Sequence, residues 1–270
     1  VAKANSTIRI GPSILDYGNS LNITADTTGT KGITAKLDGK DAKVNGYTIE
    51  IPVLDAGSYT LTVTTIADDN HNPITKTASI TVNKLKTALS AKSIATVYNV
   101  NKNLVITLKD SKGNAISGAN ITVQLKDAKT YTTNKNGQIT VPTKGLIPKT
   151  YTAKITFKGN DNYTGSNTTA EVTVKKATAK ITAKAKTFST TTKTKKYTIT
   201  LKNSKNKAMK KTKVTLNVKG KTYTAKTNSK GKATFKITKL TKKGTYKAVV
   251  TYKGNTYYKK VTKSASIKIK

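Results

Sequence analysis

The sequence predicts an all-β protein composed of three successive β-sandwiches, and three observations support this prediction. Apolar residues alternate with polar ones in many short stretches, which is the pattern of strands with one buried face. Turns rich in Gly, Asn and Asp interrupt these stretches about every 8–12 residues. The same succession recurs three times in 270 residues, and no segment shows the 3.6-residue apolar stripe of a helix.

Each of the three parts ends with a strand that contains Tyr, a polar turn and a β-branched strand. The Tyr-containing stretches are 54–63, 146–155 and 240–250, the turns are 68–71, 159–163 and 254–258, and the closing strands are 78–82, 170–174 and 265–269. The second and third parts also share a hairpin turn, at 133–137 and 227–231. The alignment predicts three domains of about seven strands each: repeat 1 (residues 1–85), repeat 2 (86–176) and repeat 3 (177–270).

The alternation also predicts which side chains face the core. The odd-numbered residues of 121–125 in repeat 2 are apolar, as are the even-numbered residues of 214–218 in repeat 3. In the stretch 246–252 the even-numbered residues are Tyr, Ala, Val and Tyr. We expect these residues to be buried, while Lys247 and Lys253 lie on the outer face of the same strand.

The junctions between the repeats are short. Residues 82–84 lead to Leu89, seven residues after the valine, and residues 174–176 lead to Ile181 at the same spacing. Val1–Lys3 precede Ile8 in the same way, so we expect them to be the tail of a preceding repeat and the chain to be the C-terminal part of a longer array. Neither junction contains a run of Gly, Ser or Pro, which predicts an extended, fairly stiff rod.

Charge is distributed unevenly among the repeats. Repeat 1 holds 8 basic and 8 acidic residues, repeat 2 holds 14 and 4, and repeat 3 holds 28 and none. The formal charge therefore rises from 0 to +10 to +28 along the chain. Lys is common on exposed strands as a protection against aggregation, but that protection works equally well with Glu present. The loss of every carboxylate predicts that repeat 3 contacts an anionic partner.

Motifs in repeats 2 and 3 resemble those of known surface proteins. The segments 110–123 (DSKGNAISGANITV), 133–137 (TNKNG) and 151–160 resemble the bacterial Ig-like repeats of invasin- and intimin-type surface proteins. The Lys-rich end of repeat 3, at 252–260 and 267–270, is similar to the C-terminus of adhesin-like proteins from methanogenic archaea. Repeat 1 lacks the Gly-Asn turn and the Asn-Gly hairpin of these motifs.

This resemblance implies an exported protein at the cell surface or in the cell wall, with an anionic wall polymer as partner. The resemblance also implies that Lys–Asn isopeptide crosslinks could form. Such crosslinks need a nearby carboxylate, so they concern only repeats 1 and 2, because repeat 3 has no Asp or Glu. Independently, the chain contains five Asn-x-Ser/Thr triplets as candidate glycosylation sites, although a chain rich in Asn and Thr also produces such triplets by chance. They lie in repeats 1 and 2, at Asn5, Asn22, Asn120, Asn162 and Asn167.

The composition argues against an enzyme. The chain has no Cys, which excludes disulfides, thiolate metal sites and cysteine nucleophiles. Its single histidine, His71, lies in a polar turn, and the neighbouring Asp68 and Asp69 lack the distal bidentate Glu of a calcium loop. We therefore expect no catalytic residue, no metal site and no cofactor. No stretch approaches the ~20 apolar residues of a transmembrane segment.

Sequence-specific nucleic-acid recognition is disfavoured as well. Arg9 is the single arginine among 50 basic residues, and it lies in repeat 1. Base reading uses the bidentate guanidinium of Arg, whereas Lys supplies point charges. A polymer that carries carboxylates or phosphates suits this density of Lys better.

These arguments predict a non-enzymatic adhesin or stalk fragment whose repeat 3 binds an anionic envelope or host polymer. Two alternatives remain: a purely structural spacer, and a carbohydrate-binding adhesin that uses exposed tyrosines such as Tyr257 and Tyr258. The candidate polyanion-binding residues are Lys210, Lys211, Lys213, Lys219, Lys221, Lys242, Lys243, Lys259 and Lys260.

The rod prediction can be tested by small-angle scattering. A compact globule of 270 residues has a radius of gyration of about 18 Å. We expect a clearly larger value, because the junctions pass from strand to strand without a flexible linker. A measured value close to that of the globule would contradict the rod.

Overall fold

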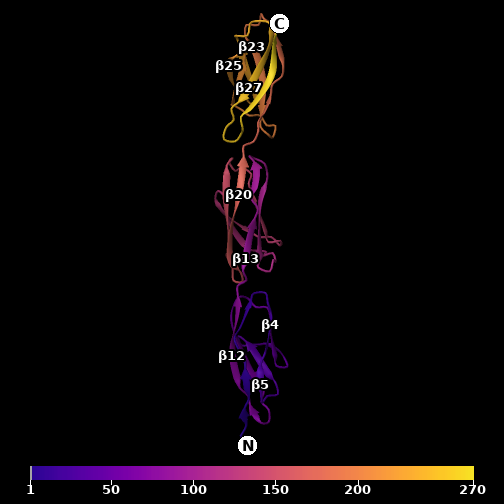
Figure 1. Ribbon diagram of the computed structural model, residues 1–270, viewed down its shortest axis with the longest axis vertical. Coiled ribbons are helices and arrows are strands. Elements are labelled where there is room, and N and C mark those ends of the chain that lie inside the picture. The colour runs from indigo at the N-terminus through magenta and orange to yellow at the C-terminus, as the bar shows by residue number, and fades with distance from the viewer. Residues whose placement is uncertain (1) are drawn as a thin grey trace. The chain divides into compact units, whose positions relative to one another are not determined.

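The structure, a computed structural model, describes residues 2–270, so Val1 of the predicted N-terminal tail lies outside the described residues. Every regular element in this range is a β-strand (Figure 1). Among residues 2–270 no helix is long and apolar enough to cross a membrane. The predicted all-β class is confirmed.

The chain forms two compact units, and the strands of repeat 2 are shared between them. One unit comprises the residues up to Lys92 together with 105–140 and 153–170. The other comprises 93–104, 141–152 and 171–270. Every sheet nevertheless draws its strands from a single repeat. The domain boundaries at residues 85 and 176 stay predictions.

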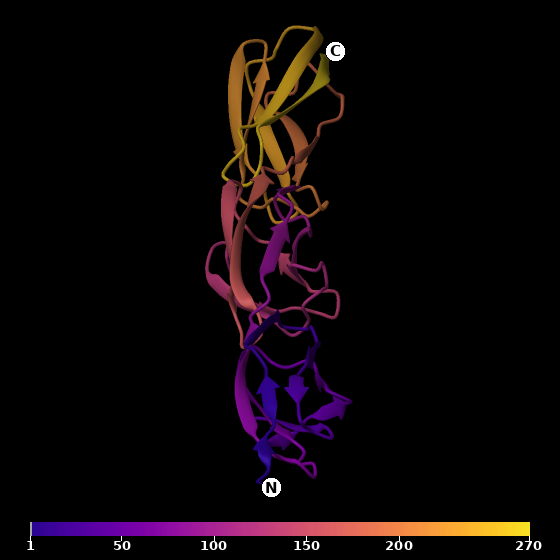
Figure 2. The ribbon, with the colours of Figure 1, turned by 60° about the horizontal axis from the view of Figure 1, so that its bottom comes forward.

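Repeat 3 shows how each sandwich is built. A three-stranded sheet, β21-β23-β26, faces a five-stranded sheet, β22-β28-β27-β24-β25, and Figure 2 shows these orange and yellow strands in two layers. β22 runs parallel to β28, whereas the neighbouring pairs are antiparallel. Two facing, largely antiparallel sheets of this kind form an Ig-like sandwich. The strands are β21 (Lys180–Thr182), β22 (Lys186–Phe188), β23 (Lys195–Lys202), β24 (Lys213–Val218), β25 (Lys221–Lys226), β26 (Lys232–Ile237), β27 (Gly244–Tyr252) and β28 (Val261–Ile269).

Repeat 2 has the same strand order, with sheets β13-β15-β18 and β14-β20-β19-β16-β17. β14 pairs in parallel with β20, as β22 does with β28. Both repeats have eight strands instead of about seven, because the first segment is divided between the two sheets. The strands are β13 (Thr87–Ala91), β14 (Ile94–Val97), β15 (Asn103–Asp110), β16 (Asn120–Gln124), β17 (Ala128–Thr132), β18 (Gln138–Pro142), β19 (Thr150–Gly159) and β20 (Thr164–Lys175).

Repeat 1 keeps the five-stranded order but differs in its other layer. The sheet β3-β12-β10-β6-β7 matches those of the other repeats, while β4-β9-β8, β2-β5 and β1-β11 form smaller sheets. This difference agrees with the missing hairpin motif of repeat 1. The strands are β1 (Ala4–Asn5), β2 (Thr7–Arg9), β3 (Ser13–Asp16), β4 (Leu21–Thr24), β5 (Asp26–Thr28), β6 (Ile33–Leu37), β7 (Lys40–Asp41), β8 (Lys43–Asn45), β9 (Thr48–Ile51), β10 (Gly57–Thr65), β11 (His71–Asn72) and β12 (Thr75–Asn83).

The cores consist of the alternating apolar residues. In repeat 3 the apolar residues of β24 and the even-numbered residues 248–252 of β27 are buried, and Tyr246 is half-buried against the same core. The polar residues between them lie on the outer face. The predicted orientation of these strands is confirmed. Burying each aliphatic side chain contributes about 1.5–3 kcal/mol, so a small core of this kind suffices only because nearly every inward position is apolar.

The shared hairpin turn depends on a glycine for a steric reason. Gly231 has a φ of +71°, and a Cβ atom at this position would lie 2.5 Å from the carbonyl oxygen of Leu201 on β23. Gly220, in the β24–β25 turn, has the same φ of +71° but no atom within 4 Å of a Cβ position. A side chain at Gly220 would therefore cause backbone strain alone, whereas a side chain at Gly231 would cause the same strain and a steric clash.

Substitution of these glycines by Ala gives a matched pair of stability measurements. Gly220→Ala is expected to destabilise repeat 3 by about 1–2 kcal/mol, the cost of a left-handed backbone with a side chain. Gly231→Ala adds an overpacking cost of about 1–3 kcal/mol. Native-state hydrogen exchange at core amides of β23 measures both. Equal effects of the two substitutions would contradict this prediction, because they would show that the backbone moves away from the added Cβ atom of residue 231 without loss of stability.

Candidate polyanion-binding face of repeat 3

The predicted lysines are all exposed, but they lie at opposite ends of the five-stranded sheet. β24 runs antiparallel to β27, with Thr215 opposite Thr251 and Val218 opposite Ala248. The first group lies where β24 begins and β27 ends, and the second lies where β24 ends and β27 begins. A strand of six residues separates them by about 20 Å. The first group is Lys210, Lys211, Lys213, Lys259 and Lys260, and the second is Lys219, Lys221, Lys242 and Lys243.

The second group surrounds Tyr246. The Nζ atom of Lys219 lies 5.6 Å from the centre of the Tyr246 ring, a cation–π distance. The Tyr246 hydroxyl donates a hydrogen bond to the main-chain oxygen of Lys242, at 2.9 Å. This arrangement stabilises the domain, since the Tyr246 hydroxyl holds the loop before β27 by a hydrogen bond and Lys219 lies over the ring.

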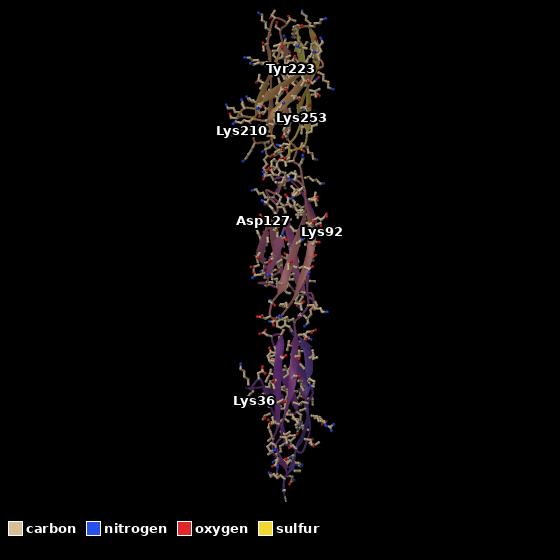
Figure 3. The ribbon with its side chains drawn as sticks, turned by 90° about the vertical axis from the view of Figure 1, so that its left-hand side faces the viewer. Lys36, Lys92, Asp127, Lys210, Tyr223 and Lys253 are labelled. Carbon is tan, nitrogen blue, oxygen red and sulfur yellow. The ribbon has the colours of Figure 1, made fainter. Side chains whose placement is uncertain are left out.

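At the other end of the sheet, two lysines from neighbouring strands and one from the segment after β27 lie on the outer face. Lys213 of β24 lies directly opposite Lys226 of β25. Lys253 follows β27 and lines the same hollow as Lys213. Figure 3 shows Lys253 and Lys210 at the same end of repeat 3. Lys226 and Lys253 are absent from the predicted set, although the alternation of residues 246–252 already placed Lys253 on the outer face.

Threonines form the floor beside these lysines. Thr215 of β24 is paired with Thr224 of β25 on one side and with Thr251 of β27 on the other. The row continues to Thr262 of β28, which is opposite Thr251. Together with Lys213 and Lys253, the first three line an open hollow of about 520 Å³. The outer face therefore presents hydroxyl groups bordered by ammonium groups, a combination that suits an anionic, hydroxyl-rich polymer.

Repeat 3 tolerates like charges directly opposite each other. Besides Lys213 and Lys226, two further cross-strand pairs consist of lysines, namely Lys196 with Lys236 and Lys180 with Lys202. Such pairs destabilise a sheet. Repeat 1 has opposite charges at comparable cross-strand positions, where Lys36 faces Asp41 and Lys43 faces Glu50 with Nζ–O distances of 3.8 and 2.7 Å.

The corresponding face of repeat 2 is less basic. Its threonine row is retained, since Thr122 is opposite both Thr130 and Thr156. Asn120 and Thr132 occupy the positions of Lys213 and Lys226, and the Thr132 hydroxyl donates to Asn120 Oδ1 at 3.0 Å. The change from an amide–hydroxyl pair to a lysine pair is therefore specific to repeat 3.

The tyrosines proposed for sugar binding are engaged elsewhere. Tyr257 and Tyr258 pack on Tyr98 of repeat 2, within the second unit, with ring centroids 4.7 and 6.0 Å apart. Burial raises the pKa of the Tyr258 hydroxyl, Tyr98 raises it further, and a hydrogen bond with Asn203 opposes this shift. Tyr258 is half-buried by this packing, whereas Tyr257 remains exposed, so the carbohydrate-binding alternative stays a prediction that rests on Tyr257.

The candidate glycosylation sites differ in exposure. Four of the asparagines are exposed, whereas Asn162 is half-buried. Its Oδ1 atom accepts a hydrogen bond from the N–H of Ala56, and its Nδ2 atom donates to Asp55 Oδ1, each at 2.8 Å. A glycan on Asn162 would have to displace this contact. The four exposed positions are Asn5, Asn22, Asn120 and Asn167.

The side chain of His71 is held by the carboxylate of Asp68. Its Nδ1 atom lies 2.9 and 3.0 Å from the two carboxylate oxygens of Asp68. Burial acts to raise the pKa of Asp68, but hydrogen bonds from Asn70 and His71 outweigh it and hold the pKa below its ordinary value. The stabilisation that Asp68 provides is therefore present above its ordinary pKa and is lost as the pH falls through the lowered value. In the part of the chain that the structure describes, no group of three His, Cys, Asp or Glu residues could hold a metal ion.

Comparisons with known proteins identify no family. No family model matches the chain, and no curated protein matches it. A solved structure of a 1.5-MDa bacterial ice-binding adhesin, studied for host cell surface retention, is 14% identical, with 99% of this chain and 100% of that chain covered and a TM-score of 0.35. The I-band fragment I67–I69 of titin is 13% identical over the whole of both chains, with a TM-score of 0.39. A Ca²⁺-stabilized, ice-binding adhesin of an Antarctic bacterium is 14% identical, with 100% and 75% covered and a TM-score of 0.31. The Ig-like assignment rests on the strand order of this chain.

The lysine pair predicts a stability gain on neutralisation. Lys226→Thr introduces the residue that repeat 2 has at this position, and it should stabilise repeat 3 by about 0.2–1 kcal/mol at low salt. The gain should shrink as salt screens the repulsion. Lys232→Thr is the matched control, because Lys232 lies opposite the neutral Thr200. Hydrogen exchange at core amides of β24 measures both variants, and equal effects would contradict the assigned repulsion.

Proposed function

We propose that the chain is a non-enzymatic adhesin or stalk fragment of a cell surface, and that its repeat 3 binds an anionic polymer of the cell wall, envelope or host surface. The observation that carries the proposal is the outer face of repeat 3, where Lys213, Lys226 and Lys253 border a threonine floor in a domain without acidic residues. Proteins seldom place lysines opposite each other when Glu would serve, so an external anion supplies the missing counter-charge.

Binding by this face would be electrostatic. Each Lys–anion contact releases counterions from the polymer, so the affinity should fall log-linearly with salt. The threonine hydroxyls add hydrogen bonds with sugar hydroxyls or acidic groups, which gives a reason for placing the lysines around a polar floor. Nucleic acid is the weaker candidate, since the single arginine, Arg9, is in repeat 1.

Repeats 1 and 2 fit the role of a spacer in this proposal. Their surfaces are neutral to moderately basic, and the candidate glycosylation sites lie only there. Glycans at exposed positions such as Asn22 and Asn120 would cover these repeats and leave repeat 3 free to bind. The extracellular location belongs to the same proposal, because both N-glycans and wall polymers are outside the cell.

The proposal can be tested with the whole chain and polygalacturonate, a carboxylated polysaccharide, using neutral dextran as the comparison. For three Lys–anion contacts, the affinity should fall roughly 10- to 40-fold between about 50 and about 200 mM salt. The triple variant Lys213→Gln, Lys226→Gln, Lys253→Gln should reduce the salt slope by about one for each lysine. Titration calorimetry or biolayer interferometry gives both quantities.

The matched control removes the same charge from the other end of the sheet. The variant Lys219→Gln, Lys221→Gln, Lys243→Gln should leave most of the binding intact. Equal losses of affinity in both triple variants would show that binding depends on the net charge of repeat 3 and not on the face formed by Lys213, Lys226 and Lys253. Binding that survives high salt would favour the carbohydrate-binding alternative, and no binding at low salt would leave the structural spacer.

A further inference from the structure

A loop of repeat 2 and the linker that follows repeat 1 are joined by a specific set of contacts within the first unit. Asn160 Oδ1 accepts the N–H groups of Asn162 and Tyr163, at 3.1 and 2.9 Å, and so closes the loop. The linker residue Lys84 donates from Nζ to the main-chain oxygen of Asn160, at 2.8 Å. The next residue, Leu85, forms a parallel β-bridge with Tyr163.

An aromatic pair completes this junction. The ring of Tyr163 meets the ring of Tyr17 of repeat 1 edge to face, with centroids 5.4 Å apart and an interplanar angle of 80°. Tyr17 lies in the turn after β3, and its N–H donates to the main-chain oxygen of Asn83, two residues before Leu85. Edge-to-face aromatic pairs stabilise a junction beyond the burial of the two rings.

The same contacts recur within the second unit, at the junction of repeats 2 and 3. Asn255 Oδ1 closes the loop by accepting the N–H group of Tyr258, at 2.9 Å. Lys176 donates from Nζ to the main-chain oxygen of Asn255, at 2.7 Å, and Ala177 forms a parallel bridge with Tyr258. The ring of Tyr258 meets that of Tyr98 edge to face, at 84°.

Repeat 1 has the same loop without an aromatic partner in the structure. Asp68 Oδ1 accepts the N–H groups of Asn70 and His71, at 2.8 and 2.6 Å. Lys3 donates from Nζ to the main-chain oxygen of Asp68, at 2.9 Å, and Ala4 pairs in parallel with His71. Lys3 and Ala4 therefore take the places of Lys84 and Leu85, and His71 takes the place of Tyr163 and Tyr258.

We propose that Lys3, Asp68 and His71 form a docking face for the end of an Ig-like repeat of this same kind, which places a tyrosine against the ring of His71. The partner is defined by the two junctions already described, where Tyr17 and Tyr98 follow the strand that pairs in parallel with the last strand of their repeat. The ring of His71 can pack against such a tyrosine, because Asp68 fixes its orientation while one third of the side chain stays exposed.

Repeat 3 cannot supply this tyrosine. The N–H of Thr190 donates to the main-chain oxygen of Lys270, as the N–H of Tyr98 does to that of Lys175. Thr190 thus occupies the position of Tyr17 and Tyr98 but has no ring. The docking face therefore selects repeats with Tyr in this turn and does not join the end of repeat 3 of another chain.

The test uses the full chain extended by one more repeat. Residues 86–173 are placed directly before Val1, so that the added Tyr98 meets His71 across a junction of native length. His71 is the single histidine, so its ring protons are an unambiguous NMR probe at pH 7. We expect a ring-current shift of these protons relative to the unextended chain. Tyr98→Leu in the added repeat should abolish the shift, while Tyr131→Leu, remote from the junction, should preserve it.

A second extended chain guards against misfolding of the added repeat. It carries residues 1–81 before Val1, with His71→Gln in the added copy so that the original His71 stays the single histidine. The added Tyr17 then takes the place of the added Tyr98 and should produce a shift of the same sign. Loss of that shift with Tyr17→Leu supports the docking face. If the His71 protons match those of the unextended chain in both extended proteins, or if the tyrosine substitutions leave the shift unchanged, the proposal is wrong.

Discussion

The architecture depends on one constraint, which is that nearly every inward position of each small sandwich must be apolar. The repeats contain few aromatic residues, and the even-numbered residues of strands such as β24 provide most of the buried surface. A shift of register by one residue would expose this whole set. The constraint applies only to alternate residues, so the outward positions are free to change without loss of the fold. The three repeats use this freedom to carry different surfaces on the same core.

The outward positions explain how repeat 3 reaches +28 and still folds. Lys195 is buried, with its Nζ atom donating to the main-chain oxygen of Thr192 at 2.7 Å. The other lysines of repeat 3 are exposed, so water and ions screen them. Lysine pairs such as Lys213 with Lys226 lower stability, but by less than the burial of a single aliphatic side chain contributes. An anionic polymer bound at this face would remove the repulsion. The binding function and the stability of repeat 3 would then be coupled.

The loops that precede the last strand of each repeat likewise combine a common backbone structure with a variable side chain. Asp68, Asn160 and Asn255 close three equivalent loops with the same hydrogen bonds to backbone N–H groups. The residue at the next contact position varies between His71, Tyr163 and Tyr258. The backbone bonds give each loop its shape, and the ring determines what the loop can pack against. The sequence alignment already placed His71, Tyr163 and Tyr258 at the ends of corresponding turns, and the parallel bridges at these residues show that they share a contact position.

The sequence by itself determined the all-β class, the three repeats, the inward residues and the gradient of charge. These features are local, because alternation, turn residues and composition can be read within about ten neighbouring residues. The tertiary structure decided which side chains meet. It separated Lys213 from Lys219 and joined Lys213 with Lys226 and Lys253. It also gave Tyr258 an aromatic partner, Tyr98, and Asn162 a hydrogen bond to Asp55. Strand register fixes these contacts, since it pairs residues such as Thr215 and Thr251 that lie far apart in sequence, and no local pattern encodes that pairing.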